Sequence, residues 1–363
     1  MIDRRLLWNL DWVLVGAVLA LSATGVAAIL SAGQHGPHAD LYLKQLSFLG
    51  LGFVCLGASL IPDYRRLVDR APWLYLAAVV VLAYLLFLGP RVAGTRRWLV
   101  LGPMQLQPSE FVKLVAALLL AKFFGETKKE SLGLPDVLAP GCAVALLMLL
   151  IGAAPDLGTA VCLLPLFIAT AFVGGLRAKA VLGLFLVLVL VGGLGWKYAL
   201  QPYQKARVYT FLDPNLDPKG AGYQKIQSQI AVGSGGLTGK GYLKGTQSQL
   251  GYLPARHTDF IFSVLAEEMG FVGVTVVLGL YLLVLWRAME AALLARDRVG
   301  AFLATGVTAT LAFQVVYNVG MVAGLLPVKG LPLPFMSYGG SSILASLVGI
   351  GFILNVRMRR FAN

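Results

Sequence analysis

Residues 257–286 read HTDFIFSVLAEEMGFVGVTVVLGLYLLVLW, a short polar motif followed at once by a long apolar run. A helix needs roughly 20 mostly apolar residues to cross a bilayer, and this run is longer than that. His257, Thr258 and Asp259 would then lie where the helix meets the membrane boundary. The stretch therefore indicates a membrane protein with polar groups gathered at one face.

The whole chain has the composition of a membrane protein. Hydrophobic residues make up 58% of its 363 residues and charged residues only 13%, outside the range of soluble globular domains. The apolar runs number ten, at about 12–32, 45–61, 72–89, 109–125, 136–153, 158–175, 180–200, 261–286, 300–325 and 339–356. The sequence predicts an all-α polytopic protein with ten transmembrane helices in one domain, residues 1–363. The first run is expected to be a retained span and not a signal peptide.

Lys and Arg set the expected orientation, because they favour cytoplasmic loops. With the N-terminus inside, every inner connection carries cations, from Arg4, Arg5 and Arg65 through Lys122, Lys128, Arg177 and Arg296 to Arg357. Arg91, Arg96 and Arg97 strain the rule, because they fall in a short outer connection. Both termini are nevertheless predicted to be cytoplasmic, with a large outer loop at 201–258 between spans 7 and 8.

The loop 201–258 is the only sizeable segment predicted outside the membrane. It contains seven cations, Lys219 among them, against two acids, so it is either a solvated loop near anionic lipid or a surface that attracts an anionic substrate. Tyr223, Ile226 and Ile230 share one helical face, which predicts a short interfacial helix. The sequence shows no nucleotide-binding fold, so any activated sugar donor would have to come through the membrane.

Four polar motifs each open or immediately precede a different apolar run. They are Gln107–Glu110, Pro155–Thr159, His257–Phe260 and Ser337–Ser342. In the predicted topology all four lie at the outer ends of spans 4, 6, 8 and 10. Helix N-termini attract anions, so four in one layer would suit a pyrophosphate. Ordinary capping, by Ser109, Thr258 or Ser337, is the alternative for each motif taken singly.

Two sets of ionisable residues stand out near these helix starts. Glu110 and Lys113 share a face at i,i+3, as a structural ion pair or as part of a polar cavity. Asp259 would be an ionised acceptor at neutral pH, so it is either a general base or a carboxylate that bonds the backbone amides of its own helix. His257 is distant in sequence from His35 and His38, and the three cysteines lie in apolar runs, so no metal site is predicted.

The motifs together resemble the SEDS family, and its rod-shape branch in particular. The resemblance rests on Asn318 to Ser342, with Gly324-Leu325-Leu326-Pro327, and on Arg96-Arg97-Trp98, Leu101-Gly102-Pro103, Gln107–Glu110, Pro155–Thr159, Gly220–Tyr223, Gly245–Gln249 and Arg256–Phe260. It covers nearly the whole chain. Ala255 is one departure, since relatives usually carry Glu there, and a catalytic role for that Glu is therefore not expected.

The resemblance implies a GT-C-like peptidoglycan glycosyltransferase that polymerises lipid II at the outer face of the bacterial cytoplasmic membrane. Asp259 matches the family's essential Asp and would be the base for an inverting displacement of undecaprenyl pyrophosphate. Arg97, Lys113, Arg207 and Lys240 are the expected cations for that leaving group. The full set of candidate substrate and pyrophosphate-binding residues is Arg97, Glu110, Lys113, Asp156, Arg207, Lys240, His257, Thr258, Ser337 and Ser341.

The resemblance also implies partners and one alternative function. The implied partners are lipid II, the undecaprenyl-pyrophosphate-linked glycan strand, a class B penicillin-binding protein that supplies the transpeptidase, and other membrane proteins of the elongation complex. No nucleic acid is expected. A divalent cation, Mg²⁺ or Mn²⁺, could assist the pyrophosphate, but the outer face has no cluster of acids that predicts one. The alternative function is a lipid II flippase, which typically has internal repeats that are not apparent here.

Overall fold

The structure is a computed structural model that describes residues 9–361 except 35–39, 93, 103, 128, 130, 200–201 and 219. Arg4, Arg5, His35, His38, Pro103, Lys128 and Lys219 lie outside the described residues. The described part is mostly helical, as the sequence predicts.

Each of the ten apolar runs coincides with a helix in the described part of the chain. These helices are α2 (Trp12–Gly33), α3 (Leu41–Leu60), α5 (Ala71–Leu88), α6 (Pro108–Glu126), α7 (Leu134–Ala153), α8 (Leu157–Val173), α9 (Ala178–Leu194), α13 (Ile261–Leu293), α14 (Arg298–Val322) and α15 (Gly340–Met358). Among the described helices, seven are long and apolar enough to cross a membrane, and α8 is apolar but shorter.

Aspartates define where several of these helices begin. The carboxylate of Asp11 accepts from the Leu14 amide at the start of α2 (3.2 Å), and that of Asp297 accepts from the Gly300 amide at the start of α14 (2.8 Å). A side-chain acceptor at this position satisfies an amide that the helix leaves unpaired. Proline in the first turn of α5, α6 and α7 is also compatible with a helix start.

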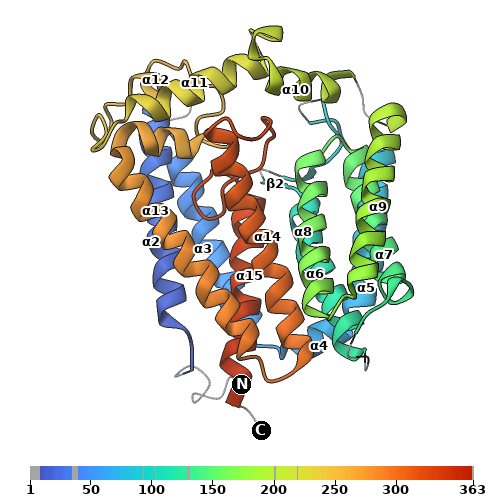
Figure 1. The fold of residues 1–363 in the computed structure, drawn as a ribbon. Coiled ribbons are helices and arrows are strands. Elements are labelled where there is room, and N and C mark those ends of the chain that lie inside the picture. The colour runs from blue at the N-terminus through green and yellow to red at the C-terminus, as the bar shows by residue number, and fades with distance from the viewer. Residues whose placement is uncertain are drawn as a thin grey trace.

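The bundle is arranged around α15, which is almost wholly buried and packs against α3 and α14. α14 in turn packs against α6, α8 and α13, while α5, α7 and α9 lie together on one side (Figure 1). The two ends of the described chain and the short helix α4 (Tyr64–Asp69) lie at the same end of the bundle. The helices between α9 and α13 lie across the opposite end.

The loop 201–258 has more helical structure than predicted. It contains α10 (Pro202–Leu212) and α12 (Thr246–Gln249) in addition to α11 (Ala221–Ser234), which coincides with the predicted short helix. On α11 the side chains of Ile226 and Ile230 are exposed, while Ser228 is buried and donates to the Val322 carbonyl of α14 (2.9 Å). Two members of the predicted face therefore point away from the protein, and the placement of α11 in the membrane interface stays a prediction.

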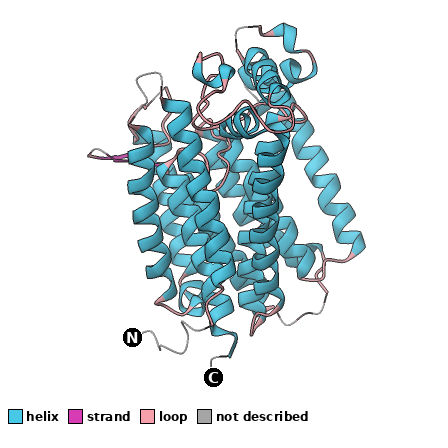
Figure 2. Cartoon of the chain, turned by 90° about the vertical axis from the view of Figure 1, so that its left-hand side faces the viewer, coloured by secondary structure: helices cyan, strands magenta, loops and turns pink. Residues whose placement is uncertain are grey.

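A short antiparallel hairpin departs from the all-α prediction. β1 (Leu99–Leu101) pairs with β2 (Met104–Leu106) in the connection before α6 and projects from the side of the bundle (Figure 2). The strands are three residues each, too short for alternation in the sequence to reveal them.

A break in α13 at Gly270 is a second feature that the apolar pattern did not predict. Gly270 has φ 62°, and the chain around Gly236–Gly241 enters the break. The Phe271 amide donates to the Gly236 carbonyl (2.9 Å), and the Lys240 amide donates to the Glu267 carbonyl (3.0 Å). Protein groups thus satisfy the backbone that the break leaves open.

The orientation prediction can be tested by labelling single cysteines in intact cells. Cysteine at Thr238 or Leu250, both exposed in the loop, is expected to react with an impermeant thiol reagent added outside. Cysteine at Lys129 or Arg296, exposed at the other end, is expected to react only after permeabilisation. The reverse pattern would place the polar motifs on the cytoplasmic side and contradict the predicted orientation.

Candidate functional site

The structure brings the four polar motifs together into one hydrogen-bonded layer. Gln107 is at its centre: its amide donates to Ser341 Oγ (2.8 Å), and its Nε2 donates to Asp156 Oδ2 (2.7 Å). Ser109 Oγ donates to the same oxygen of Asp156 (3.0 Å). The starts of α6, α8 and α15 are therefore tied directly to one another.

The remaining motif, His257–Phe260, joins this layer through the segment before α15. Ser337 Oγ donates to the Thr258 carbonyl (2.6 Å), and the Tyr338 amide donates to the His257 carbonyl (2.9 Å). The rings of His257 and Tyr338 meet edge to face with centroids 6.0 Å apart. Ser337 and the His257–Thr258 backbone thus hold the chain that leads into α13 against the start of α15.

Helix capping explains only one of these motifs. Asp156 does cap α8, through the Thr159 amide (3.3 Å). The capping interpretation is wrong for Ser109, Thr258 and Ser337, because no side chain caps α6, α13 or α15 among the described residues. Thr258 Oγ1 instead donates to the Ala255 carbonyl (3.2 Å). The polar residues at these helix starts connect the motifs to one another.

Asp259 lies in this layer with its carboxylate uncommitted. It does not cap α13, and no hydrogen bond to its carboxylate is made by any described residue. Its main chain is fixed, because Asn318 Nδ2 donates to the Asp259 carbonyl (2.9 Å). Gly330 faces it so closely that a Cβ there would lie 3.3 Å from Asp259 Oδ2. A held backbone with a free carboxylate suits a group that must meet an external ligand.

The electrostatic surroundings of Asp259 favour a base that titrates near neutrality. Burial raises the pKa of the Asp259 carboxyl to about 6, and the positive charges of Arg207 and Arg97 oppose that increase. Both arginines are therefore close enough for their charges to act on the carboxylate, Arg207 from α10 and Arg97 from the connection before β1. A carboxylate with a pKa close to the working pH is better matched to proton transfer than one at its ordinary value.

Arg97 also lies beside the second acid of the layer. Its Nη1 is 4.0 Å from Asp156 Oδ1, and its guanidinium lies over the Trp98 ring at 5.8 Å. The Nε atoms of Arg96 and Arg97 are buried without a hydrogen-bond partner among the described residues. They border a pocket whose lining combines these cations with apolar side chains: Leu82, Leu85, Arg96, Arg97, Ser109, Ile151, Ala154 and Asp156.

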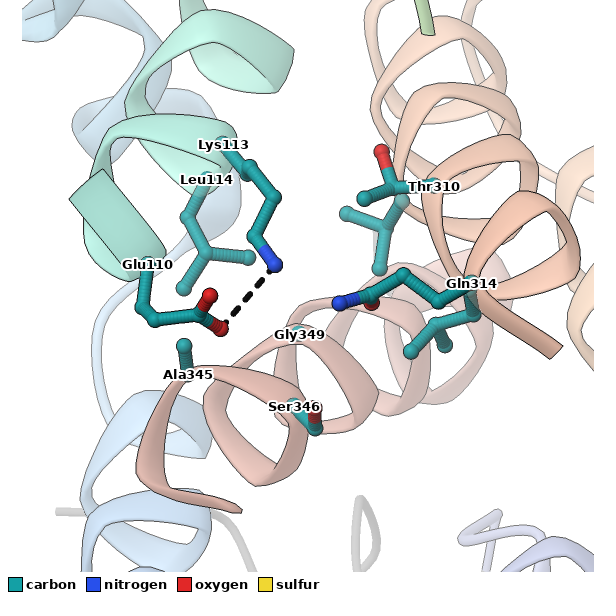
Figure 3. A pocket seen from close by; sticks show the side chains of 10 residues that line it. Glu110, Lys113, Leu114, Thr310, Gln314, Ala345, Ser346 and Gly349 are labelled. Carbon is teal, nitrogen blue, oxygen red and sulfur yellow. Dashed lines mark hydrogen bonds and ion pairs between the residues drawn. The ribbon is translucent and has the colours of Figure 1, made fainter. Parts of the chain in front are cut away.

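Glu110 and Lys113 form the ion pair that their spacing predicts. Both side chains are buried, and Lys113 Nζ donates to Glu110 Oε2 (3.0 Å). The pair borders a second pocket, between α6, α14 and α15, whose other polar lining residues are Thr310, Gln314 and Ser346 (Figure 3). The Gln314 amide points toward the pair, and its Nε2 has no partner among the described residues.

Lys240 is not with the other candidate cations. Its Nζ donates to Glu267 Oε1 (2.7 Å) and to Thr246 Oγ1 (2.7 Å). Glu267 is completely buried, so Lys240 is committed to an acid of α13. The structure therefore assigns Lys240 to an internal ion pair and not to the group that faces Asp259.

Three residues of the layer were missed as candidates by the sequence analysis. Gln107 and Asn318 lie within motifs that the sequence singles out, but their amides give no sequence signal of a bridging role. Lys329 stands directly before Gly330 and close enough to Arg207 for its charge to lower the Lys329 pKa, after burial, which lowers it most. It is a lone cation in the connection between α14 and α15, and that position was the only sequence signal it gave.

The donor set of the layer does not fit a resident divalent metal ion. No group of three or more His, Cys, Asp or Glu within the described ranges could hold one. The oxygens of Asp156 already accept from Gln107, Ser109 and the Thr159 amide, and Asp259 faces two arginines. A site built from protein ligands alone needs several free oxygens, and among the described residues of this layer only the Asp259 carboxylate has them.

The fold and the site define a membrane protein with several helices able to cross a bilayer. Its polar site, with an uncommitted acid and nearby arginines, lies where four of its helices begin. The chain belongs to the family of the cell cycle proteins FtsW, RodA and SpoVE, which matches residues 4–361. This result confirms the family expected from the sequence motifs.

Similar proteins match this chain over nearly its whole length. The peptidoglycan glycosyltransferase MrdB of Escherichia coli K12 is 37% identical, with 99% of this chain and 97% of MrdB covered. The crystal structure of the rod shape determining protein RodA of Thermus thermophilus has a TM-score of 0.72 at 35% identity, covering 98% of both chains. A chain in a structure of a peptidoglycan synthase complex, in which polymerization and crosslinking are coordinated, has a TM-score of 0.84 at 37% identity, covering 98% and 99%.

Proposed function

We propose that this chain is a peptidoglycan glycosyltransferase that polymerises lipid II at the outer face of the cytoplasmic membrane. The observation that carries the proposal is the uncommitted Asp259 carboxylate, held beside Arg97 and Arg207 where four helix starts meet. Family membership and the similarity to MrdB and RodA support the same activity. The chain would cross the membrane ten times with both termini inside, in a GT-C-like arrangement.

In the proposed reaction Asp259 is the general base. Its carboxylate accepts the proton of the GlcNAc 4-hydroxyl of one lipid II molecule as the oxygen attacks the MurNAc anomeric carbon of the growing strand. The bond from that carbon to the pyrophosphate oxygen breaks, the configuration inverts, and undecaprenyl pyrophosphate leaves with the electron pair. A base that is positioned but not hydrogen-bonded within the protein has its lone pairs available for this step.

Cationic side chains are proposed to stabilise the leaving group. The pyrophosphate gains negative charge as the bond breaks, so fixed positive charges lower the barrier. Arg97 and Arg207 face the same space as Asp259, and Lys329 lies close to Arg207. The pocket bordered by Arg96 and Arg97 adds an apolar side formed by Leu82, Leu85 and Ile151, which suits a phosphate attached to a prenyl chain.

The remaining candidates are proposed to shape this site. Asp156, Ser337 and Ser341 hold the helix starts together, and His257 and Thr258 fix the chain before Asp259 through their carbonyls. Glu110 and Lys113 are proposed to maintain the polar pocket beneath the layer. Because Asp156 and Asp259 do not form a site for a resident metal ion, we expect Mg²⁺ or Mn²⁺ to enter only as a counterion of the pyrophosphate.

The proposed partners follow from the family and from one solved structure. The synthase complex that contains a similar chain coordinates polymerization and crosslinking. We therefore propose that this chain works with a class B penicillin-binding protein, which would supply the transpeptidase, and with other membrane proteins of cell elongation. The residues 1–363 would act as one domain, with the loop 201–258 on the outer side.

The pH dependence of polymerisation tests the role of Asp259. A base must be deprotonated, so a carboxyl pKa of about 6 predicts that kcat/KM falls as pH drops below about 6, instead of below its ordinary value near 4. Arg97→Ala or Arg207→Ala removes a charge that lowers this pKa, so the acidic limb should move to higher pH. A wild-type limb near pH 4, or a limb that does not move in either variant, would contradict the assignment.

A further inference from the structure

Glu267 lies in α13 beyond the polar layer, and its contacts are not explained by the proposed reaction. Its side chain is completely buried. The carboxylate accepts four hydrogen bonds, all from the segment 240–248: from Lys240 Nζ (2.7 Å), Thr246 Oγ1 (3.1 Å), the Gln247 amide (2.8 Å) and the Ser248 amide (3.1 Å). Burying a carboxylate is unfavourable unless it is satisfied in this way, so the arrangement has a definite structural role.

Glu267, although it belongs to α13, caps the start of the short helix α12. Gln247 and Ser248 are the second and third residues of α12, whose N-cap is Gly245. Gly245 has no side chain, so the amides that an N-cap normally satisfies are satisfied by Glu267. A Cβ at Gly245 would lie too close to Ser248 Oγ and 2.8 Å from Glu267 Oε2, so this close approach favours glycine.

From α12 the contacts lead directly to the segment that carries Asp259. The Arg256 guanidinium donates to the Ser248 carbonyl. Arg256 follows Ala255, which has φ 49° and whose carbonyl accepts from the amides of Thr258 (3.1 Å) and Phe260 (3.3 Å). Asp259 lies inside this turn. Hydrogen bonds and the covalent chain between them therefore connect the Glu267 carboxylate to the turn that contains Asp259.

The neighbouring acid, Glu268, connects the segment 240–248 to a second helix, α2. Glu268 is buried and accepts from the Ser31 hydroxyl of α2 and from the backbone of Leu243 and Gly245. Gln249 Nε2, at the end of α12, donates to the Ser31 carbonyl (3.0 Å). The Asp259 segment is thus supported from α2 and α13 through α12.

We propose that Glu267 is a positioning residue for Asp259, acting through the cap on α12 and the Arg256–Ser248 contact. The proposal rests on the proposed function of Asp259 as base. Glu267 itself is completely buried and bonded to four donors, so it does not meet the substrate. Catalytic rates are sensitive to displacements of about 1 Å, and loss of the cap would allow a shift of that size.

Polymerisation kinetics of Glu267→Ala and Glu267→Gln test this proposal. Glu267→Ala removes every acceptor, and we expect kcat to fall by roughly 10- to 100-fold while KM for lipid II stays within about twofold. Glu267→Gln keeps one oxygen to accept from the α12 amides, so it should recover part of the loss. If the alanine variant does not fold, Glu267→Gln alone carries the test, with kcat expected to fall by at least about threefold.

Asp136→Asn is the matched control, because Asp136 also accepts from a backbone amide at a helix start, that of Gly133 before α7.

Two further measurements separate positioning from a general loss of stability. In an Asp259→Asn background, Glu267→Ala should cause no additional loss of the residual rate, because both changes act on the same step. Hydrogen exchange in the folded variant should speed up at 246–249 and also at 256–260. Unchanged kcat in both variants, additive losses, or faster exchange confined to 246–249 would each overturn the proposal. If Asp259→Asn polymerises normally, the proposed function fails, whereas the exchange data still decide whether Glu267 holds the Asp259 segment.

Discussion

Asp259→Asn is expected to lower lipid II polymerisation by a factor of at least about 10², the low end for a positioned acid–base group, at normal yield and thermal stability. Asparagine retains the size of the side chain and removes both the charge and the proton acceptor. The folded protein should tolerate it, because the Asp259 carboxylate caps no helix and makes no hydrogen bond to a described residue. Asp259→Glu should recover little, since one more methylene moves the carboxylate by about an ångström.

The matched control for this variant is Asp213→Asn in the same loop, where the carboxylate accepts from the Asn215 amide (3.0 Å) on the exposed surface. It makes the same chemical change and should leave the rate within about twofold of the wild type. A folded Asp259→Asn protein that polymerises at the wild-type rate would remove Asp259 from the mechanism.

Lys113→Ala is expected to destabilise the protein by about 3–5 kcal/mol, because it leaves the buried Glu110 carboxylate without its partner. The effect should appear as a large drop in the thermal midpoint in detergent. Replacing both residues, as Glu110→Gln with Lys113→Met, removes the charges together at similar volume. This double variant should regain most of the stability.

The activity of the double variant separates a structural pair from a functional one. We expect it to remain impaired in polymerisation, because the pocket of Thr310, Gln314 and Ser346 loses its charged wall. Wild-type polymerisation by the double variant at normal expression would show that Glu110 and Lys113 serve only to stabilise the bundle.

Hydrophobic length predicted the helices of this fold well, because a bilayer-spanning helix leaves a continuous apolar signal. Each predicted run coincides with a helix of the described chain. The break at Gly270 left no such signal, since the residues on both sides are apolar and the break depends on the backbone of Gly236–Gly241, which is distant in sequence. The β1–β2 hairpin and α12 were not predicted because elements of three or four residues are too short for a periodic pattern, and α10 was not predicted either.

The candidate site was predictable at the level of motifs but not of individual contacts. The four polar helix starts do form one layer, and Glu110 pairs with Lys113. Charge alone could not distinguish Arg207, which faces Asp259, from Lys240, which is bonded to Glu267, because both lie in the same basic loop. Neutral bridging residues such as Gln107 and Asn318 are recognised only by what they touch.

The most direct test of the central claim is to give the purified protein labelled lipid II in detergent. A polymerase needs no second compartment, whereas a flippase has nothing to transport without one. The proposed function predicts glycan polymer in the detergent assay, with no polymer from the Asp259→Asn variant. Absence of polymer from folded wild-type protein, together with transfer of lipid II between the leaflets of reconstituted vesicles, would contradict it and support the transporter.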